Sequence, residues 1–264
     1  MTHPANGNTV GDMETMVTVG TDKVWAEDSG GSGPVVVLLH EGIGDSSMWD
    51  PIWPELTARC RVVRYDVRAY RKSPPATEKY TLLGDLRAVL DHFGLSRVHL
   101  VGCSMGGGTA IEFALAAPSR VESLTLLCPG IAGYPWPDEP ELEAEFQAIG
   151  DDEDGLVDLC LRVWGASGAN EFVTEMTRSA IRAGDNEQAY MQEGEPTFDR
   201  LSEITAPTVL MIGDKDRAAL IDSNEQAAEM IPGCKLIRMP GVDHYPTARE
   251  PKLIAETILA QASS

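Results

Sequence analysis

The sequence predicts an α/β protein with a doubly wound, mostly parallel sheet and a helical cap inserted between two of its strands. Short apolar runs that suit buried strands alternate with helical segments along most of the chain. The alternation stops at residues 131–200, which are acidic, interrupted by Pro and Gly, and helical in pattern. At 264 residues the chain has room for one such domain with an inserted subdomain. We therefore expect a core of residues 13–130 and 201–264, with residues 131–200 as the cap.

The strands are predicted from the apolar pattern. Alternating Val and polar residues predict an edge pair at Thr15–Val19 and Lys23–Glu27, and residues 1–12, which are mostly small and polar, are expected to be disordered. The continuous apolar run Val35–Leu39 predicts a central parallel strand covered on both faces. Further strands are expected at Cys60–Tyr65, around His99–Val101, and at Val121–Leu127, Thr208–Ile212 and Lys235–Met239.

The helices are predicted from apolar residues at helical spacing. In the core this spacing marks Leu82–Phe93, which Gly94 ends as a C-cap would, and the segment Met105–Ala117. A last helix is expected from about Glu250 to Ala262. Two cap helices are expected, one with Leu156, Leu159, Cys160 and Val163 on its apolar face and one with Phe172, Met176 and Ile181.

Composition restricts the partners of this chain. Its 41 acidic and 21 basic residues give a net charge of −20, and such a surface repels phosphate backbones and anionic lipid. We therefore expect a small-molecule substrate, with neither nucleic acid nor membrane as a partner. The five cysteines have no paired-ligand spacing, which predicts reduced thiols rather than a zinc or redox motif. Together with an amino terminus that has no apolar signal segment, they predict a cytoplasmic protein.

The strongest chemical signal is the pentapeptide Gly102-Cys103-Ser104-Met105-Gly106. It is a G-x-S-x-G pattern that follows an expected strand and precedes an expected helix. Such a sharp turn needs small flanking residues and exposes the Ser104 hydroxyl at the carboxyl edge of the sheet. It also places the amide of Met105 at a helix amino terminus, where negative charge is stabilised. We predict that Ser104 is a nucleophile.

A serine nucleophile needs a base within hydrogen-bonding reach, and the chain has five histidines. His3 lies in the polar amino terminus, His92 in an expected helix and His99 in an expected strand. His40 ends the first central strand and is better placed to shape a loop. His244 follows the last strand in a loop that can reach over the sheet edge, so we predict His244 as the base.

An acidic residue between Ser104 and His244 in the chain would orient the base. Asp214 and Asp216 both follow the strand Thr208–Ile212, and either could instead cap the next turn. The position of these residues alone leaves the choice between them open.

Several of these segments together resemble the α/β-hydrolase superfamily. The resemblance covers the core from about Val35 to the carboxyl terminus and leaves the cap unmatched. It includes small esterases, enol-lactonases and cofactor-free haloperoxidases, which share the S-M-G-G of Ser104–Gly107. Haloalkane dehalogenases and epoxide hydrolases fit less well, because they carry Asp where this chain has Ser104. The segments concerned are Leu38-Leu39-His40, Asp66-Val67-Arg68, Gly102–Gly107, Gly213-x-x-Asp216 and Asp243-His244.

The resemblance implies further site residues. It selects Asp216 as the fourth residue of G-x-x-D, and it implies that the amides of Gly42 and Met105 form an oxyanion hole. It implies an acyl-enzyme mechanism on carboxylic esters or lactones with no metal or cofactor. Hydrolysis or lysis of a carbon–carbon bond on the same triad stays open, as does a ligand-binding receptor built on this scaffold.

Two departures from the family pattern concern the loops beside the expected site. Glu41 stands between His40 and Gly42, where the family has a small residue, and we favour an outward-facing carboxylate over a catalytic one. The family has glycines where this chain has Ala69 and Arg71, which suggests a reshaped loop that could bring Tyr70 or Arg71 to substrate. Candidate pocket residues, each of which could equally belong to the core, are Glu41, Met48, Trp49, Met105, Tyr134, Trp136, Trp164, Phe172 and Tyr245.

Overall fold

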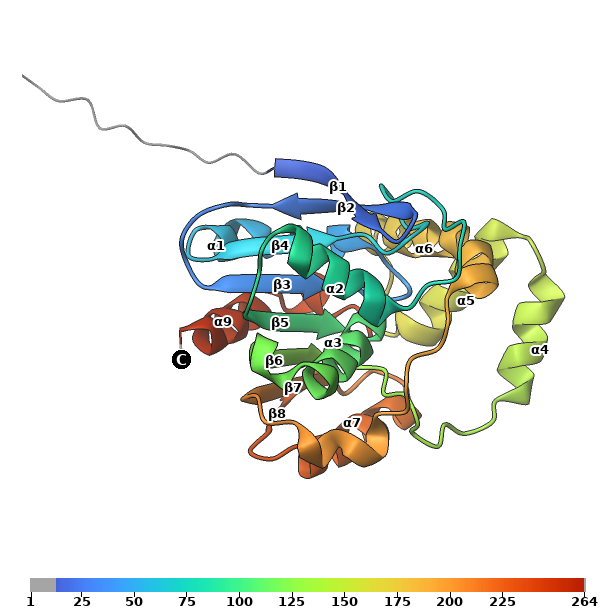
Figure 1. The fold of residues 1–264 in the computed structure, drawn as a ribbon. Helices are drawn as coiled ribbons and strands as arrows, with labels where there is room; N and C mark the ends of the chain where they lie inside the picture. The colour runs from blue at the N-terminus through green and yellow to red at the C-terminus, as the bar shows by residue number, and fades with distance from the viewer. Residues whose placement is uncertain (1–12, 264) are drawn as a thin grey trace, which may run out of the picture.

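The computed structural model describes residues 13–263, which form a single twisted sheet with helices on both faces (Figure 1). The strands lie in the order β1-β2-β4-β3-β5-β6-β7-β8. Strands β3 to β8 are mutually parallel, whereas β2 runs antiparallel to both β1 and β4. The bounds are β1 (Met13–Val19), β2 (Asp22–Asp28), β3 (Val35–Leu39), β4 (Arg61–Tyr65), β5 (Val98–Cys103), β6 (Val121–Leu127), β7 (Thr208–Gly213) and β8 (Lys235–Met239).

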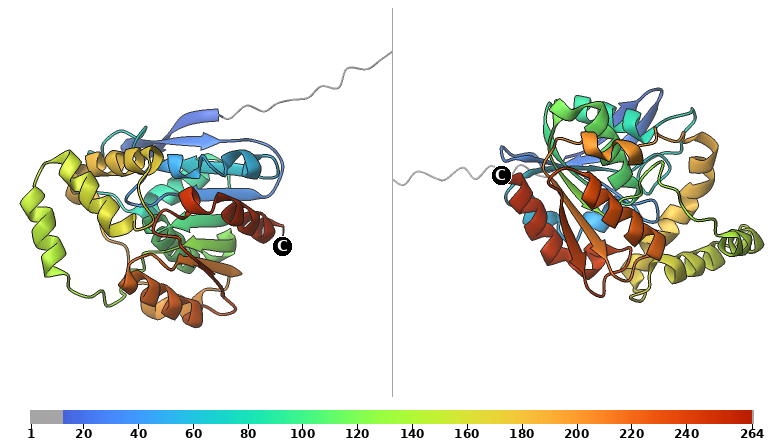
Figure 2. Two further views of the ribbon diagram at one scale, coloured as in Figure 1. Left: turned by 180° about the vertical axis from the view of Figure 1, so that it is seen from behind. Right: turned by 90° about the horizontal axis from the view of Figure 1, so that it is seen from below.

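Helices cover the sheet from both sides, as parallel strands joined by crossovers require. Helices α2, α3 and α7 lie on the face toward the viewer in Figure 1, and α1 and α9 lie on the opposite face in Figure 2. The doubly wound, mostly parallel α/β fold predicted from the sequence is confirmed. The core helices are α1 (Trp53–Thr57), α2 (Leu82–His92), α3 (Met105–Ala116), α7 (Ala218–Met230), α8 (Pro246–Arg249) and α9 (Pro251–Ala262).

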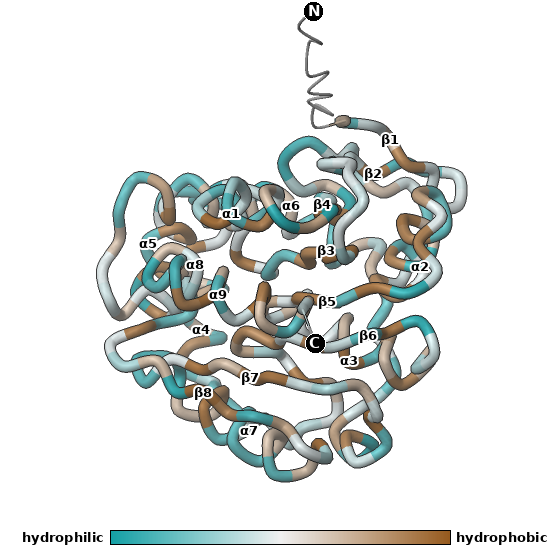
Figure 3. The backbone as a smooth tube through the Cα atoms, turned by 90° about the vertical axis from the view of Figure 1, so that its left-hand side faces the viewer, coloured by the Kyte–Doolittle hydropathy of each residue, from teal (hydrophilic) through white to brown (hydrophobic). Residues whose placement is uncertain are grey.

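The apolar core runs through the middle of the sheet. Figure 3 shows hydrophobic segments along β3, β5 and β7, with hydrophilic segments outside them. Four of the five residues of β3 are buried, and Leu100 in β5 and Leu210 in β7 are fully buried. This burial on both faces explains why the central strands have continuous apolar sequences rather than alternating ones.

The inserted segment forms three helices over the carboxyl ends of the strands (Figures 1 and 2). They are α4 (Pro140–Ile149), α5 (Glu153–Trp164) and α6 (Glu171–Tyr190). Helix α6 lies against the loop between β4 and α2, where Asn186 exchanges two hydrogen bonds with the backbone of Ala76 and Tyr80 forms an isolated parallel bridge with Met191. Helix α4 extends away from the sheet. The sequence pattern indicated α5 and α6 but not α4, which has no buried residue.

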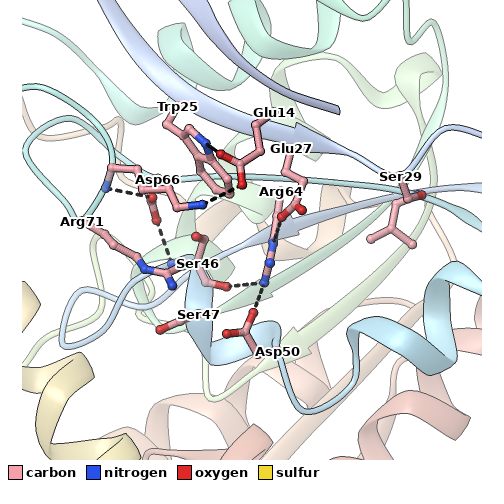
Figure 4. A network of polar contacts seen from close by, with 12 residues as sticks. Glu14, Trp25, Glu27, Ser29, Ser46, Ser47, Asp50, Arg64, Asp66 and Arg71 are labelled. Atoms are coloured by element: carbon pink, nitrogen blue, oxygen red, sulfur yellow. Dashed lines mark hydrogen bonds and ion pairs between the residues drawn. The ribbon is translucent and has the colours of Figure 1, made fainter. Parts of the chain in front are cut away.

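A buried polar network ties the loop after β3 to the edge of the sheet (Figure 4). Arg64 of β4 donates to Glu27 of β2 at 2.7 Å and pairs with Asp50 after the 3₁₀ turn Ser46–Trp49. Asp66 accepts a hydrogen bond from the amide of Ser46 at 2.9 Å. These contacts fix the course of the chain just after His40 and Glu41, where the site begins.

Two further predictions concern the amino-terminal segment and membrane association. The expected disorder of residues 1–12 lies outside the described residues. Within residues 13–263, no helix has the length and apolar content needed to cross a bilayer.

Candidate active site

Ser104 stands between β5 and α3 in a strained conformation. Its φ of 47° and ψ of −112° lie in a region that L-residues rarely adopt. The strain persists because the surrounding backbone determines it: the amide of Ser104 donates to the carbonyl of Leu127 at 2.9 Å, and its carbonyl accepts from the amides of Gly108 and Gly130. The half-buried side chain lines a cavity at the carboxyl edge of the sheet.

The glycines around Ser104 are required by close backbone packing. A Cβ on Gly102 would lie 2.3 Å from the carbonyl oxygen of Gly106, and a Cβ on Gly106 would lie 2.3 Å from that of Leu39. The amide of Gly106 donates to the carbonyl of His40 at 3.1 Å. The end of β3 and the start of α3 are therefore in direct contact, which is how the G-x-S-x-G pattern shapes this turn.

His244 lines the same cavity, and its imidazole contacts the buried Asp216. The Nδ1 atom of His244 lies 2.7 Å from Oδ2 of Asp216, and both side chains are buried. Gly213 allows this approach, because a Cβ there would lie 2.0 Å from the carbonyl oxygen of Val242. Asp214 instead accepts from the amide of Gly241 at 2.7 Å and braces the loop that carries His244. The two aspartates thus occupy different positions, and Asp216 is the one in contact with the imidazole.

The surroundings of His244 favour its protonated form. Burial opposes protonation, but the charges of Cys128 and Asp216 and their hydrogen bonds outweigh it and raise the pKa of His244 well above its ordinary value. The amide of His244 donates to the carbonyl of Trp164 at 3.1 Å. The cap therefore contacts the loop of the candidate base directly.

Gly42 and Met105 lie side by side next to Ser104. The position that a Cβ of Gly42 would take is 3.7 Å from both Cβ and Sδ of Met105. The amide of Met105 is in the first turn of α3, where helix amides have no intrahelical acceptor. The Tyr70 hydroxyl lies 3.1 Å from the carbonyl oxygen of Gly42 and pairs with Glu187 of the cap. This arrangement suits two amide donors that converge on one oxyanion.

Glu41 does not face outward as the sequence suggested. Its side chain is fully buried, its Oε2 accepts from the Cys103 thiol at 3.3 Å, and its Oε1 has no partner. It packs against Gly44, where a Cβ would lie 2.8 Å from Oε1. Burial raises the pKa of Glu41 to about 8, although nearby His244 and the Cys103 thiol lower it. The predicted outward orientation of the Glu41 carboxylate was wrong, because the next residues, Gly42 to Gly44, turn the chain back over the carboxyl group.

The loop after β4 holds two non-glycine residues in conformations that glycine favours. Ala69 and Arg71 adopt φ values of 71° and 41°, in the left-handed region. Tyr70 is buried with its ring 4.9 Å from that of His40, so it packs against the loop of Gly42 rather than facing solvent.

A cavity of about 230 Å³ opens beside Ser104 and His244 between core and cap. Trp136 and Trp164 from the cap line it, as the sequence suggested. Arg217, which pairs with Glu139 of the cap, lies over the Trp164 ring at 5.6 Å. The remaining lining residues are Pro137, Ala219 and Leu220.

Three other candidate pocket residues lie elsewhere. Trp49, the last residue of the 3₁₀ turn Ser46–Trp49, is fully buried in the protein core. Tyr245 is also buried, and its hydroxyl lies 2.8 Å from that of Thr177. Tyr134 packs edge-on against Trp136 and Phe198 and donates to Asp222 at 2.5 Å. The sequence left each of them open between pocket and core, because an aromatic residue can fill either, and in the structure none of the three lines the cavity beside Ser104. Met48 is likewise core, and Phe172 lines a separate surface depression.

Cys128, which the sequence did not single out, lies beside His244 and Asp216. Its sulfur, an imidazole nitrogen of His244 and a carboxylate oxygen of Asp216 all lie within 4.8 Å of one another. These are the atoms in residues 13–263 that are grouped closely enough to ligate a metal. Since His244 and Asp216 already hydrogen-bond to each other, the arrangement serves an acid–base pair with an adjacent thiol. The available signal was position, because Cys128 follows β6 as Ser104 follows β5.

Comparison with known proteins places this site in a family. The family model described as "alpha/beta hydrolase fold" matches residues 34–158. A 2-hydroxy-6-oxononadienedioate/2-hydroxy-6-oxononatrienedioate hydrolase of Pseudomonas putida is 31% identical over 239 residues, which cover 83% of this chain and 84% of that protein. The pimeloyl-[acyl-carrier protein] methyl ester esterase of Methylococcus capsulatus is 28% identical, over 83% of this chain and 91% of that protein.

Solved structures agree on the fold. The carboxylesterase CesB of Bacillus subtilis superposes with a TM-score of 0.80 at 23% identity, covering 95% of this chain and 91% of that one. The enol-lactonase of Burkholderia xenovorans gives a TM-score of 0.79 at 22% identity and covers 95% of this chain and all (100%) of that one. The chain belongs to the α/β-hydrolase family. It is a hydrolase, and the resemblance predicted from its sequence is confirmed.

Proposed function

We propose that this protein is a serine hydrolase that cleaves small carboxylic esters or lactones through an acyl-enzyme. The observation that carries the proposal is the strained Ser104, which shares a cavity with a His244 that is hydrogen-bonded to Asp216. A strained serine beside an imidazole–carboxylate pair is the arrangement that nucleophilic acyl transfer needs.

In the first step Ser104 attacks the substrate carbonyl. Its proton passes to His244 as the new C–O bond forms and the carbonyl π electrons move to the oxygen. The amides of Gly42 and Met105 stabilise that oxyanion. Asp216 keeps the proton of Nδ1 and stabilises the imidazolium. When the intermediate collapses, the alkoxide leaves with the proton held by His244.

In the second step water clears the acyl-enzyme. His244 takes a proton from water as its oxygen attacks the ester carbonyl, and the resulting oxyanion occupies the same two amides. Collapse releases the acid and returns the proton from His244 to Ser104. For a lactone the two products remain joined as one hydroxy acid.

The cavity supports a small substrate. Its volume of about 230 Å³ and its two tryptophans suit a short, partly apolar acyl or alcohol group. A second candidate is hydrolysis of a carbon–carbon bond beside a ketone. The Pseudomonas putida relative favours it, because its substrate is named as an oxo-dienedioate rather than as an ester.

The test is hydrolysis of p-nitrophenyl acetate and butyrate by wild type and Ser104→Ala. We expect wild type to turn over both esters and Ser104→Ala to lose about 10⁴-fold or more in kcat while it keeps its melting temperature within a few degrees. Asp216→Asn should also lower kcat, because Asp216 holds the His244 imidazole. Asp214→Asn is its matched control, because Asp214 accepts from the amide of Gly241 instead. Absence of ester turnover in folded wild type would reject the esterase proposal and favour the carbon–carbon alternative, which a 2-hydroxy-6-oxo-dienoate substrate then tests.

A further inference from the structure

Two thiols lie directly behind the proposed triad. Cys103 ends β5 just before Ser104, Cys128 follows β6, and their sulfur atoms are 3.6 Å apart. Their exposed fractions are 0% and 1%, so neither thiol can reach a substrate. The proposed mechanism uses neither of them.

The backbone of Cys128, like that of Ser104, has a positive φ. Cys128 has a φ of 38°, and it is one of four non-glycine residues with positive φ in the described part of the chain. Its amide donates to the carbonyl of Met211 at 2.8 Å. A strained residue that the surrounding structure fixes is a reason to look for a function of its side chain.

That side chain meets the imidazole. The Cys128 sulfur lies within 4.8 Å of a ring nitrogen of His244 and of a carboxylate oxygen of Asp216. Behind it the Cys103 thiol reaches Glu41 at 3.3 Å. A continuous row of polar side chains therefore runs from Glu41 through Cys103 and Cys128 to His244. An apolar side chain would fill this space without bringing polar atoms into it.

We propose that Cys128 is a positioning residue of the triad, whose thiol holds the His244 ring against Asp216 and sets how readily the imidazole accepts the proton of Ser104. This inference rests on the proposed serine-hydrolase function. It adds a buried group beside the base that lies within 4.8 Å of an imidazole nitrogen.

The electrostatics agree with this role. Burial alone would raise the pKa of the Cys128 thiol, but the hydrogen bond with Cys103 and the charge of His244 outweigh it and bring that pKa to about 7. The pKa of His244 rises in turn because the Cys128 thiolate stabilises the imidazolium. The other titratable groups that face this pair are Asp216 after β7, Cys103 at the end of β5 and Glu41 after β3.

The sign of the expected effect follows from this coupling. Removal of the thiol removes a partner that stabilises the imidazolium, so the pKa of His244 falls. The acidic limb of the pH profile of kcat/KM then moves to lower pH. A less firmly held ring also lowers kcat on the plateau, whereas substrate binding, and with it KM, changes little.

The experiment compares wild type, Cys128→Ala and Cys128→Ser on p-nitrophenyl butyrate from pH 5 to pH 9. Cys60→Ala is the control, since Cys60 is a buried cysteine that precedes β4 at the opposite end of the sheet. We expect the acidic limb of the kcat/KM profile to move down by roughly one pH unit in both Cys128 variants. We expect plateau kcat to fall about tenfold in Cys128→Ala and less in Cys128→Ser, with KM nearly unchanged. If the acidic limb of the kcat/KM profile stays at the wild-type pH in the Cys128 variants, the proposal is overturned, whether or not plateau kcat falls.

A second readout separates this inference from the proposed function. The Cε1–H signal of His244, assigned with His244→Gln, can be titrated by NMR without any substrate. A lower imidazole pKa in Cys128→Ser than in wild type supports the positioning role even if no ester is cleaved, and an unchanged pKa overturns it. Cys128→Ser is nearly isosteric, so it carries the test if Cys128→Ala does not fold.

Discussion

At the scale of single residues, the site is predictable where the chemistry leaves a local pattern. Ser104 and His244 could be named from the sequence, since one stands in G-x-S-x-G and the other is the single histidine in a loop after the last strand. Cys128 could not be, because a cysteine after a strand looks the same whether it packs or acts. The burial of Glu41 was missed for a related reason: it depends on how Gly42 to Gly44 fold over the side chain, and no local pattern encodes that.

Glu41 gives the first prediction at this scale, which concerns stability and pH. Its pKa is about 8 in the folded protein, against an ordinary value of 4.5. The unfolded chain therefore releases this proton at lower pH than the folded one, and the folded state loses relative stability as pH rises from about 4.5 to 8. Glu41→Gln removes this loss. The free energy of unfolding of the variant relative to wild type should rise by roughly 2–4 kcal/mol between pH 5 and pH 8.5.

Urea unfolding at several pH values measures this difference. The control is Glu55→Gln, because Glu55 is an exposed residue in the first turn of α1. Its difference from wild type should stay flat over the same range. A flat difference for Glu41→Gln as well would mean that the buried carboxyl is ionised in the folded protein at neutral pH, contrary to its raised pKa.

At the scale of elements, the turn between β5 and α3 is where sequence and structure agree best. Its small residues are needed at defined places, because a Cβ added to Gly102 or Gly106 would lie only 2.3 Å from a backbone oxygen. The strands were predictable for a similar reason, since burial on both faces imposes continuous apolar runs. Helix α4 was not predicted, because its apolar face is short: only Leu142, Phe146 and Ile149 recur at helical spacing, they are only half-buried, and acidic residues surround them.

The strain at Ser104 gives a prediction for this element. Replacement by Gly relieves the positive φ, whereas replacement by Ala keeps it, so Ser104→Gly should be more stable than Ser104→Ala by about 1 kcal/mol. The same pair of substitutions at Ser179, inside α6, should give the opposite order, because Gly weakens a helix interior. Urea denaturation of the four variants measures the difference in free energy of unfolding between Gly and Ala at each position. Equal stabilities at position 104 would show that the turn relaxes when the hydroxyl is removed.

At the scale of the whole molecule, the substrate cavity is formed by segments that are far apart in the chain. Trp136 and Trp164 come from the cap, whereas Arg217 and Leu220 follow β7 in the core. Sequence patterns predicted that a cap exists, but they could not say which of its aromatic residues turn toward the nucleophile. Trp49 and Trp164 illustrate this limit. Both are large aromatic residues, and only the packing of cap on core places Trp164 in the cavity and Trp49 in the interior.

The same geometry predicts that Trp164 limits the length of the group accepted beside Ser104. Trp164→Ala enlarges the cavity of about 230 Å³ while the hydrogen bond from the His244 amide to the backbone carbonyl of residue 164 remains. We expect the ratio of kcat/KM for p-nitrophenyl octanoate to that for the butyrate to rise about tenfold or more. Trp136→Ala should change the ratio less, since Trp136 is 43% exposed at the cavity rim. If the ratio in folded Trp164→Ala matches wild type, the variable group of the substrate binds on the other side of the triad, toward Gly42 and helix α6.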